Sequence, residues 1–147
     1  MYDMPVLLQA LVPWFSGLAS LVLLDLAWIG LLAADFYKSR TGHLLNMDDG
    51  GMTVNIPAAI ATWLVIVTGI QLFVLPRTTA GGLPLAALFW GAAFGAILYA
   101  VYNLTNYALL KDWPLSVVVV DILWGAFLCS ITATVMALTS RALDHVL

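Results

Sequence analysis

The chain has 147 residues, of which 63% are hydrophobic and only 9% are charged. Soluble domains average about 25% charged residues, so this composition excludes a soluble globular domain and indicates an integral membrane protein. The net charge of -3 comes without a basic cluster, which excludes a nucleic-acid-binding face and a polybasic lipid patch. We therefore expect the partners of this protein in the membrane and none among nucleic acids.

Four apolar runs follow one another, and each is long enough to cross a hydrocarbon core about 30 Å thick. Their approximate bounds are Val6–Ala34, Pro57–Leu75, Leu83–Leu110 and Pro114–Thr139. Only a short turn at Lys111 separates the third run from the fourth, so these two form an antiparallel hairpin. Residues 35–55 are the most polar stretch, and we expect an interfacial loop there. The sequence thus predicts one all-α membrane domain over residues 1–147, a polytopic protein with a four-transmembrane-helix bundle.

An even number of spans places both termini on one side of the membrane, with the polar loop and the Lys111 turn on the other. Lys38, Arg40 and Lys111 lie on the side of the loop, whereas Arg77 and Arg141 lie on the side of the termini. Because basic residues favour the cytoplasmic side, this distribution favours termini outside the cytoplasm, in the periplasm of a bacterial cell. The preference depends on a single charge.

Two aspartates interrupt the apolar runs, Asp25 in the first span and Asp121 in the fourth. An aspartate at the centre of a spanning helix costs roughly 2.5 to 3.5 kcal/mol on insertion scales, so two of them need a reason. Each is followed three residues later by a tryptophan, Trp28 or Trp124, which places carboxyl group and indole on one helix face. At 1.5 Å per residue, both aspartates lie about 12 to 15 Å from the same end of the bundle.

The third span adds a stripe of small and polar residues at helical steps of three and four. The stripe consists of Gly91, Gly95, Tyr99, Tyr102, Asn103 and Asn106. Since no Lys, Arg or His lies within any span, the aspartates must find neutral hydrogen-bond donors. We therefore predict a polar cluster in one half of the bundle that binds a ligand or a proton. Its candidate residues are Asp25, Trp28, Tyr99, Tyr102, Asn103, Asn106, Asp121 and Trp124.

The same residues have a simpler interpretation, which the sequence leaves open. Polar side chains often hydrogen-bond between membrane helices and hold a bundle together, and Gly91 and Gly95 form a small-xxx-small packing seam. The remaining tryptophans are interpreted as interface anchors or packing residues. They are Trp14, Trp63, Trp90 and Trp113. Tyr37, in the polar loop, could lie flat on the membrane surface.

No pattern in the sequence indicates catalysis or metal binding. It contains no Ser-His-Asp arrangement, Gly-rich phosphate loop or His cluster, so we expect no catalytic residues and no metal site. The single cysteine, Cys129, excludes an intramolecular disulfide and is expected to be a buried free thiol.

Several short motifs, in order along the chain, resemble a family of small bacterial membrane proteins catalogued as domain of unknown function 2177. They are Leu24–Gly30, Asp35–Tyr37, Gly42–Leu45, Tyr102–Ala108, Trp113–Pro114 and Asp121–Gly125. The resemblance covers nearly the whole chain and implies a four-span, multi-pass protein of the bacterial inner membrane without an assigned activity. One position departs from the pattern: where Tyr-Asp-Leu-Thr-Asn is expected, this chain has Asn103 in place of the aspartate.

Three functions of different classes fit these features. The first, favoured by the lack of a catalytic set, is a non-enzymatic component: an accessory or structural subunit of a larger membrane complex, or a binder of a lipophilic molecule. The second is a proton-coupled small transporter working as a dimer. The third is a lipid-modifying membrane enzyme that uses Asp25 or Asp121 as acid or base. No cofactor is predicted, although a bound lipid, quinone or pigment would fit. The expected partners are membrane lipids and either other membrane chains or further copies in a homo-oligomer.

Overall fold

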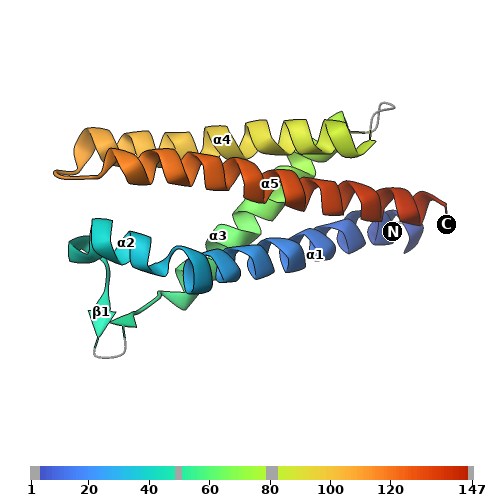
Figure 1. Cartoon of the computed structure of the whole chain (residues 1–147). Helices are drawn as coiled ribbons and strands as arrows, with labels where there is room; N and C mark the ends of the chain where they lie inside the picture. Colours follow the sequence, from blue (N-terminus) through green and yellow to red (C-terminus); the bar gives the residue numbers. More distant parts are fainter. Residues whose placement is uncertain (1–3, 49–50, 79–82, 146–147) are drawn as a thin grey trace.

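Four long helices carry most of the chain and run in alternating directions (Figure 1). The computed structural model describes residues 4–48, 51–78 and 83–145. The long helices are α1 (Met4–Ala27), α3 (Ile56–Gly69), α4 (Leu83–Leu109) and α5 (Leu115–Asp144). π-helical turns extend two of them, η1 (Trp28–Leu32) after α1 and η3 (Ile70–Val74) after α3. The 3-10 turn η4 (Leu75–Arg77) follows η3 and ends the second spanning segment.

Each of these segments is long and apolar enough to cross a membrane, which confirms the all-α, four-span architecture. The spanning stretches run over Val6–Leu32, Ile56–Arg77, Pro84–Leu109 and Leu115–Asp144. The first three end close to the predicted positions. The fourth is longer than predicted, because neither Gly nor Pro follows Gly125 and the helix continues through Arg141.

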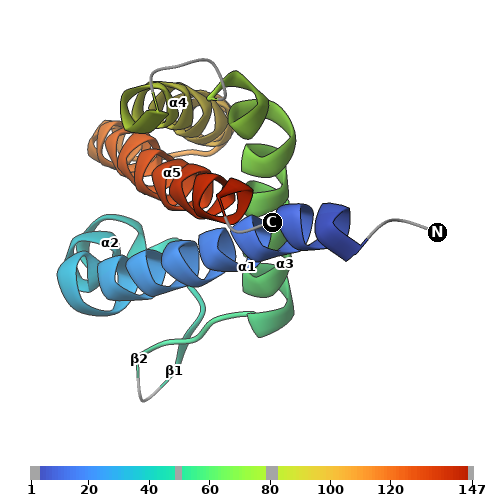
Figure 2. The same cartoon turned by 90° about the vertical axis from the view of Figure 1, so that its right-hand side faces the viewer.

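Three of the long helices lie side by side, and the fourth crosses them. Figures 1 and 2 show α1, α5 and α4 stacked next to one another, with α3 passing obliquely along one side of the stack. The start of α1, the end of α3 and the end of α5 lie at one end of the bundle, and the turn between α4 and α5 lies at the other (Figure 1). This arrangement agrees with the prediction that both termini are on one side.

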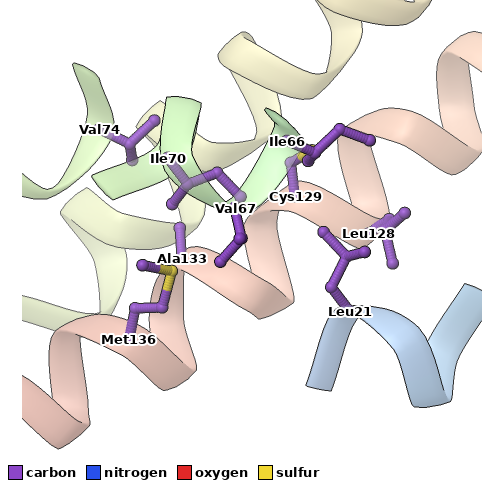
Figure 3. Packing of buried hydrophobic residues seen from close by; sticks show 9 residues of the cluster. All are labelled: Leu21, Ile66, Val67, Ile70, Val74, Leu128, Cys129, Ala133 and Met136. Atoms are coloured by element: carbon purple, nitrogen blue, oxygen red, sulfur yellow. The ribbon is translucent and has the colours of Figure 1, made fainter. Parts of the chain in front are cut away.

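The apolar core lies where α3 meets α1 and α5 (Figure 3). Its buried members are Leu21, Ile66, Val67, Ile70, Val74, Leu128, Cys129, Ala133 and Met136. Cys129 is a free thiol in this core, as predicted. α3 contributes buried residues to the core only from Ile66 onwards, and its first half diverges from α4 (Figure 1).

Glycines let α4 and α5 approach backbone to backbone. A Cβ atom at Gly91 would lie 2.6 Å from the carbonyl oxygen of Cys129, and one at Gly95 would collide with the carbonyl oxygen of Gly125. A Cβ atom at Gly125 would collide in turn with the ring of Tyr99. Small residues at this seam therefore set the separation of the hairpin and seat Tyr99 against α5.

The predicted interfacial loop is largely structured. It holds the helix α2 (Ala34–Thr41), the 3-10 turn η2 (Gly42–Leu44) and an antiparallel pair of two-residue strands, β1 (Met47–Asp48) and β2 (Gly51–Met52). Residues 49 and 50 lie outside the described ranges. α2 continues from η1 towards the end of the bundle that carries the turn between α4 and α5 (Figure 1). It thereby comes close to the start of α5.

Candidate functional site

Asp25 accepts hydrogen bonds from two tryptophans on two other helices. Its Oδ2 lies 2.8 Å from Nε1 of Trp63 on α3, and its Oδ1 lies 3.4 Å from Nε1 of Trp124 on α5. An indole N-H can only donate, so both carboxyl oxygens of Asp25 act as acceptors. This one side chain ties α1 to α3 and α5.

Asp121 accepts hydrogen bonds from a hydroxyl and an amide. The hydroxyl of Tyr37 on α2 donates to its Oδ1, and Nδ2 of Asn103 on α4 lies 3.0 Å from its Oδ2. The Asn103 amide also donates to the carbonyl of Tyr99, at 3.2 Å. Asn103 is 0% exposed, and its Oδ1 has no partner in the described part of the chain. Asp121 therefore connects α5 to α2 and α4 and leaves one buried acceptor beside it.

A pair of stacked indoles joins the two carboxyl groups. The rings of Trp28 and Trp124 lie with centroids 4.4 Å apart and planes 7° from parallel. Trp124 donates to Asp25, and Trp28 donates at 3.2 Å to the Tyr37 hydroxyl, which donates onward to Asp121. We call this connected set the aspartate-indole network. Its members are Asp25, Trp28, Tyr37, Trp63, Asn103, Asp121 and Trp124.

A π-helical turn carries Trp28. The turn η1 is closed by a 2.8 Å bond from the backbone N-H of Ala33 to the carbonyl of Trp28, five residues earlier. Such a turn contains one residue more than an α-helical turn and so shifts the faces of all side chains that follow it. π-helical turns are rare and are found frequently at functional sites. Here the turn lies between Asp25, which accepts from two indoles, and Tyr37, which donates to the carboxyl group of Asp121.

The network is held together by neutral donors. Each of the four carboxyl oxygens of Asp25 and Asp121 receives one hydrogen bond from an indole, a hydroxyl or an amide. These bonds offset part of the cost of removing the carboxyl groups from water. Among the residues that the structure describes, no three His, Cys, Asp or Glu side chains gather closely enough to hold a metal ion.

Tyr37 is a persistent donor in this network. It lies outside the first spanning stretch, on α2. Burial, with the hydrogen bond to Asp121 adding to it, raises the pKa of Tyr37 above its usual value. The hydroxyl therefore keeps its proton throughout the neutral and mildly alkaline range.

A groove of about 580 Å³ opens between α3 and α4, where α3 diverges. It is lined by Ala61, Thr62, Val65 and Ile66 on α3 and by Leu98, Tyr99 and Tyr102 on α4. Most of this lining is apolar, and its polar groups are the hydroxyls of one threonine and two tyrosines. Val65 is 68% exposed and Tyr102 is 59% exposed, so the groove is open on the outer surface of the helix bundle.

Five of the eight candidate residues from the sequence lie in the network, namely Asp25, Trp28, Asn103, Asp121 and Trp124. Tyr99 lies between network and groove, because its carbonyl accepts from Asn103 while its side chain lines the groove. A binding role for these residues stays a prediction.

Tyr102 and Asn106 lie outside the aspartate-indole network, although Tyr102 lines the groove. The ring of Tyr102 lies edge-on to Trp113, with centroids 6.3 Å apart. Within the described ranges, the side chain of Asn106 makes no hydrogen bond. Both residues share a helical stripe with Asn103, but only Asn103 faces α5 closely enough to reach Asp121.

Two members of the network were not among the candidates. Trp63 was interpreted as an anchor or packing residue, and Tyr37 as a residue lying on the membrane surface. Trp63 does pack against the apolar core, as that interpretation expects, and it also donates to Asp25. The interpretation of Tyr37 is wrong, because its half-buried hydroxyl donates to Asp121. The sequence feature that could have identified Trp63 is its depth in the second span, which is similar to the depth of Asp25 in the first. The feature that could have identified Tyr37 is its place in the Asp35–Tyr37 motif.

Comparison with protein families gives a match over most of the chain. A family described as predicted membrane protein (DUF2177) has a model that matches residues 10–138. No curated protein and no solved structure matches the chain. The matched range contains every member of the aspartate-indole network and every residue that lines the groove.

Proposed function

This chain belongs to the DUF2177 family of predicted membrane proteins, and from that premise we propose that it binds a lipophilic molecule of the bilayer between α3 and α4. The observation that carries the proposal is the groove. Its volume of about 580 Å³ falls in the range of small-molecule sites, about 300 to 1,000 Å³. Its exposure to the bilayer supports entry of a ligand from the lipid phase.

The lining of the groove favours an amphiphile. The α3 side offers apolar contacts through Val65 and Ile66, whereas Tyr99 and Tyr102 on α4 offer hydroxyl groups. A molecule with an apolar body and carbonyl or ester oxygens, such as a quinone or a lipid, would match both sides. A lipid, quinone or pigment is therefore the class of ligand that we expect.

Tyr99 would couple the ligand to the buried network. Its side chain lines the groove, and its ring contacts Gly125 on α5. A ligand that displaces the Tyr99 ring would therefore disturb the helix seam at Gly125, next to Trp124, whose indole donates to Asp25. Binding in the groove would thus change the hydrogen bonds around a carboxyl group of the network.

Native mass spectrometry of gently extracted protein tests this proposal. The expected result is a bound lipid, quinone or pigment that is lost when a bulky side chain fills the groove. Protein that carries no small molecule in any mild detergent would contradict the proposal. The same spectra report partner chains and so also test the proposed role as an accessory subunit of a larger complex.

A second candidate function is proton-coupled transport. It is favoured by two buried carboxyl groups that a continuous series of hydrogen bonds and one ring stack connect across the bundle. Proteoliposomes would then show substrate-driven proton movement that Asp25→Asn or Asp121→Asn abolishes. Flux that is equal in wild type and both variants would exclude this function.

For the location, we propose the bacterial inner membrane with both termini outside the cytoplasm. The support is the excess of basic residues on the side of α2 and the Lys111 turn. Reporter fusions test it: a C-terminal alkaline phosphatase should be active, and a C-terminal fluorescent protein should be dark. The reverse pattern would invert the orientation.

A further inference from the structure

A second pocket, of about 330 Å³, lies at the opposite end of the bundle from Asp121 and α2. It is formed by the start of α1, the end of the α3 segment and the end of α5. Four of its side chains carry amide or charged groups: Gln9, Gln71, Arg141 and Asp144. Leu75 and Ala137 add apolar surface. Because three spanning segments end here, the pocket lies at the level where lipid headgroups meet the protein.

Gln71 is held in the pocket by a second π-helical turn, η3. Its Nε2 donates to the backbone carbonyl of Ala10 at 3.2 Å, which fixes the amide. Its Oε1 is buried and has no partner within the described residues. A buried acceptor without a donor is costly, so a donor supplied by a ligand would be favourable here.

The pocket also presents one positive and one negative side chain. Arg141 and Asp144 are three residues apart on α5 and therefore lie on one face of the helix. Within the described ranges the two side chains form no ion pair with each other, and Asp144 accepts a long hydrogen bond, 3.4 Å, from Nε2 of Gln9. Arg77, the other arginine at this end, is engaged elsewhere, with the Phe73 carbonyl and the Trp90 ring.

We propose that this pocket binds the zwitterionic headgroup of an ethanolamine phospholipid. An arginine guanidinium pairs with phosphate oxygens through two parallel hydrogen bonds, and Arg141 is available for that contact. A primary ammonium has three donors, which suit the carboxylate of Asp144 and the unpartnered Oε1 of Gln71. A choline headgroup has no such donors, and a glycerol headgroup has no positive charge. The ethanolamine headgroup therefore fits better than either.

Lipid competition tests the assignment. Full-length protein is equilibrated with mixed micelles of phosphatidylethanolamine, phosphatidylglycerol and phosphatidylcholine with identical acyl chains, and the retained lipid is identified by native mass spectrometry. Wild type should retain phosphatidylethanolamine preferentially. Arg141→Gln should lower the retention of all three lipids roughly tenfold, because each loses a charge-assisted hydrogen bond to its phosphate. Asp144→Asn should remove the preference for phosphatidylethanolamine over phosphatidylglycerol.

Arg77→Gln is the matched control, since it removes an arginine at the same end of the bundle but outside the pocket. It should retain lipid like wild type. Equal retention by wild type of all three headgroups, or equal losses in Arg141→Gln and Arg77→Gln, would overturn the assignment. A groove-filling variant at Ala61 should leave the headgroup preference unchanged, so the two sites are tested separately.

Discussion

The indole rings of Trp28 and Trp124 stack at 4.4 Å, and their N-H groups donate to different acceptors, the Tyr37 hydroxyl and Asp25. An aromatic pair of this kind contributes roughly 0.5 to 1.5 kcal/mol beyond the area that it buries. A shift of either indole ring would also change the hydrogen bonds around a carboxyl group, so the stack links the positions of Trp28 and Trp124. These contacts therefore connect the two aspartates, although they lie in the first and the last spanning helix.

Replacing Tyr37 by phenylalanine tests the link between α2 and α5. The Tyr37→Phe variant leaves both Oδ1 of Asp121 and the N-H of Trp28 without their partner. We expect the free energy of unfolding to fall by roughly 1 to 3 kcal/mol, measured by thermal unfolding in detergent. Tyr107→Phe is the control, because Tyr107 is 50% exposed and no side-chain hydrogen bond is recorded for it within the described ranges. Equal stability of the two variants would contradict the link.

The raised pKa of Tyr37 also predicts that the stability of the protein depends on pH in the alkaline range. Because burial raises the pKa of Tyr37, the folded protein holds this proton more tightly than the unfolded chain, in which the pKa of a tyrosine is about 10. Stability should therefore fall as the pH rises above about 10, and it should fall less steeply in Tyr37→Phe. Unfolding curves recorded from pH 8 to pH 11 measure both slopes. Identical slopes would show that Tyr37 contributes nothing to this dependence.

The two aspartates should differ in their tolerance of asparagine. In Asp25→Asn the new amide group faces an indole N-H, and neither Trp63 nor Trp124 can accept from it. In Asp121→Asn the new amide can donate to Oδ1 of Asn103 after rotation of that side chain, because this oxygen has no other partner in the described chain. Asp25→Asn should therefore be less stable than Asp121→Asn, by roughly 1 kcal/mol in thermal unfolding. The reverse order would contradict the donor assignment.

Trp63 should be more than a packing residue. Trp63→Phe keeps an aromatic ring but removes the 2.8 Å hydrogen bond to Asp25, and a bond to a carboxylate contributes roughly 1.5 to 3 kcal/mol. Trp113→Phe is the matched control, because the buried Nε1 of Trp113 has no partner in the described chain. Thermal unfolding of both variants measures the difference. A loss of stability in Trp113→Phe as large as in Trp63→Phe would assign the effect to packing.

Helical periodicity and depth were enough to predict that Asp25, Asn103 and Asp121 lie at one level. Each of these residues lies on a straight segment whose end is marked by charges or by a proline, so its depth follows from counting residues. The four spans follow from length and composition in the same way.

The partners of the aspartates depend on features that leave no periodic signal. Trp63 reaches Asp25 because α3 crosses the bundle obliquely, and a crossing angle is set by packing of all side chains at the contact (Figure 2). Tyr37 reaches Asp121 because a π-helical turn precedes α2, and the sequence of η1 contains no residue specific to such a turn. Tyr102 lies outside the aspartate-indole network because the residues of one helical stripe do not all face the neighbouring helix.

Gly95 should be intolerant of any side chain. A Cβ atom there would collide with the carbonyl oxygen of Gly125, which belongs to a helix backbone and cannot move aside alone. We expect Gly95→Ala to cost roughly 1 to 3 kcal/mol in thermal unfolding, because the α4 and α5 backbones must separate. Gly30→Ala is the control, since a Cβ atom at Gly30 meets nothing within 4 Å. Equal melting temperatures for both variants would contradict the close seam.

Filling the groove should separate ligand binding from folding. Ala61 lines the groove on α3, and Ala61→Phe would place a ring in the space proposed for the ligand. Ala58 is exposed on the same helix but does not line the groove, so Ala58→Phe adds the same ring to the lipid-facing surface. Steric overlap of this size costs roughly 1 to 3 kcal/mol, so Ala61→Phe should retain about tenfold less of the copurifying molecule in native mass spectra. Both variants should unfold at the temperature of wild type, because neither substitution touches the core. If Ala61→Phe and Ala58→Phe retain the molecule equally well, it is bound elsewhere on the protein.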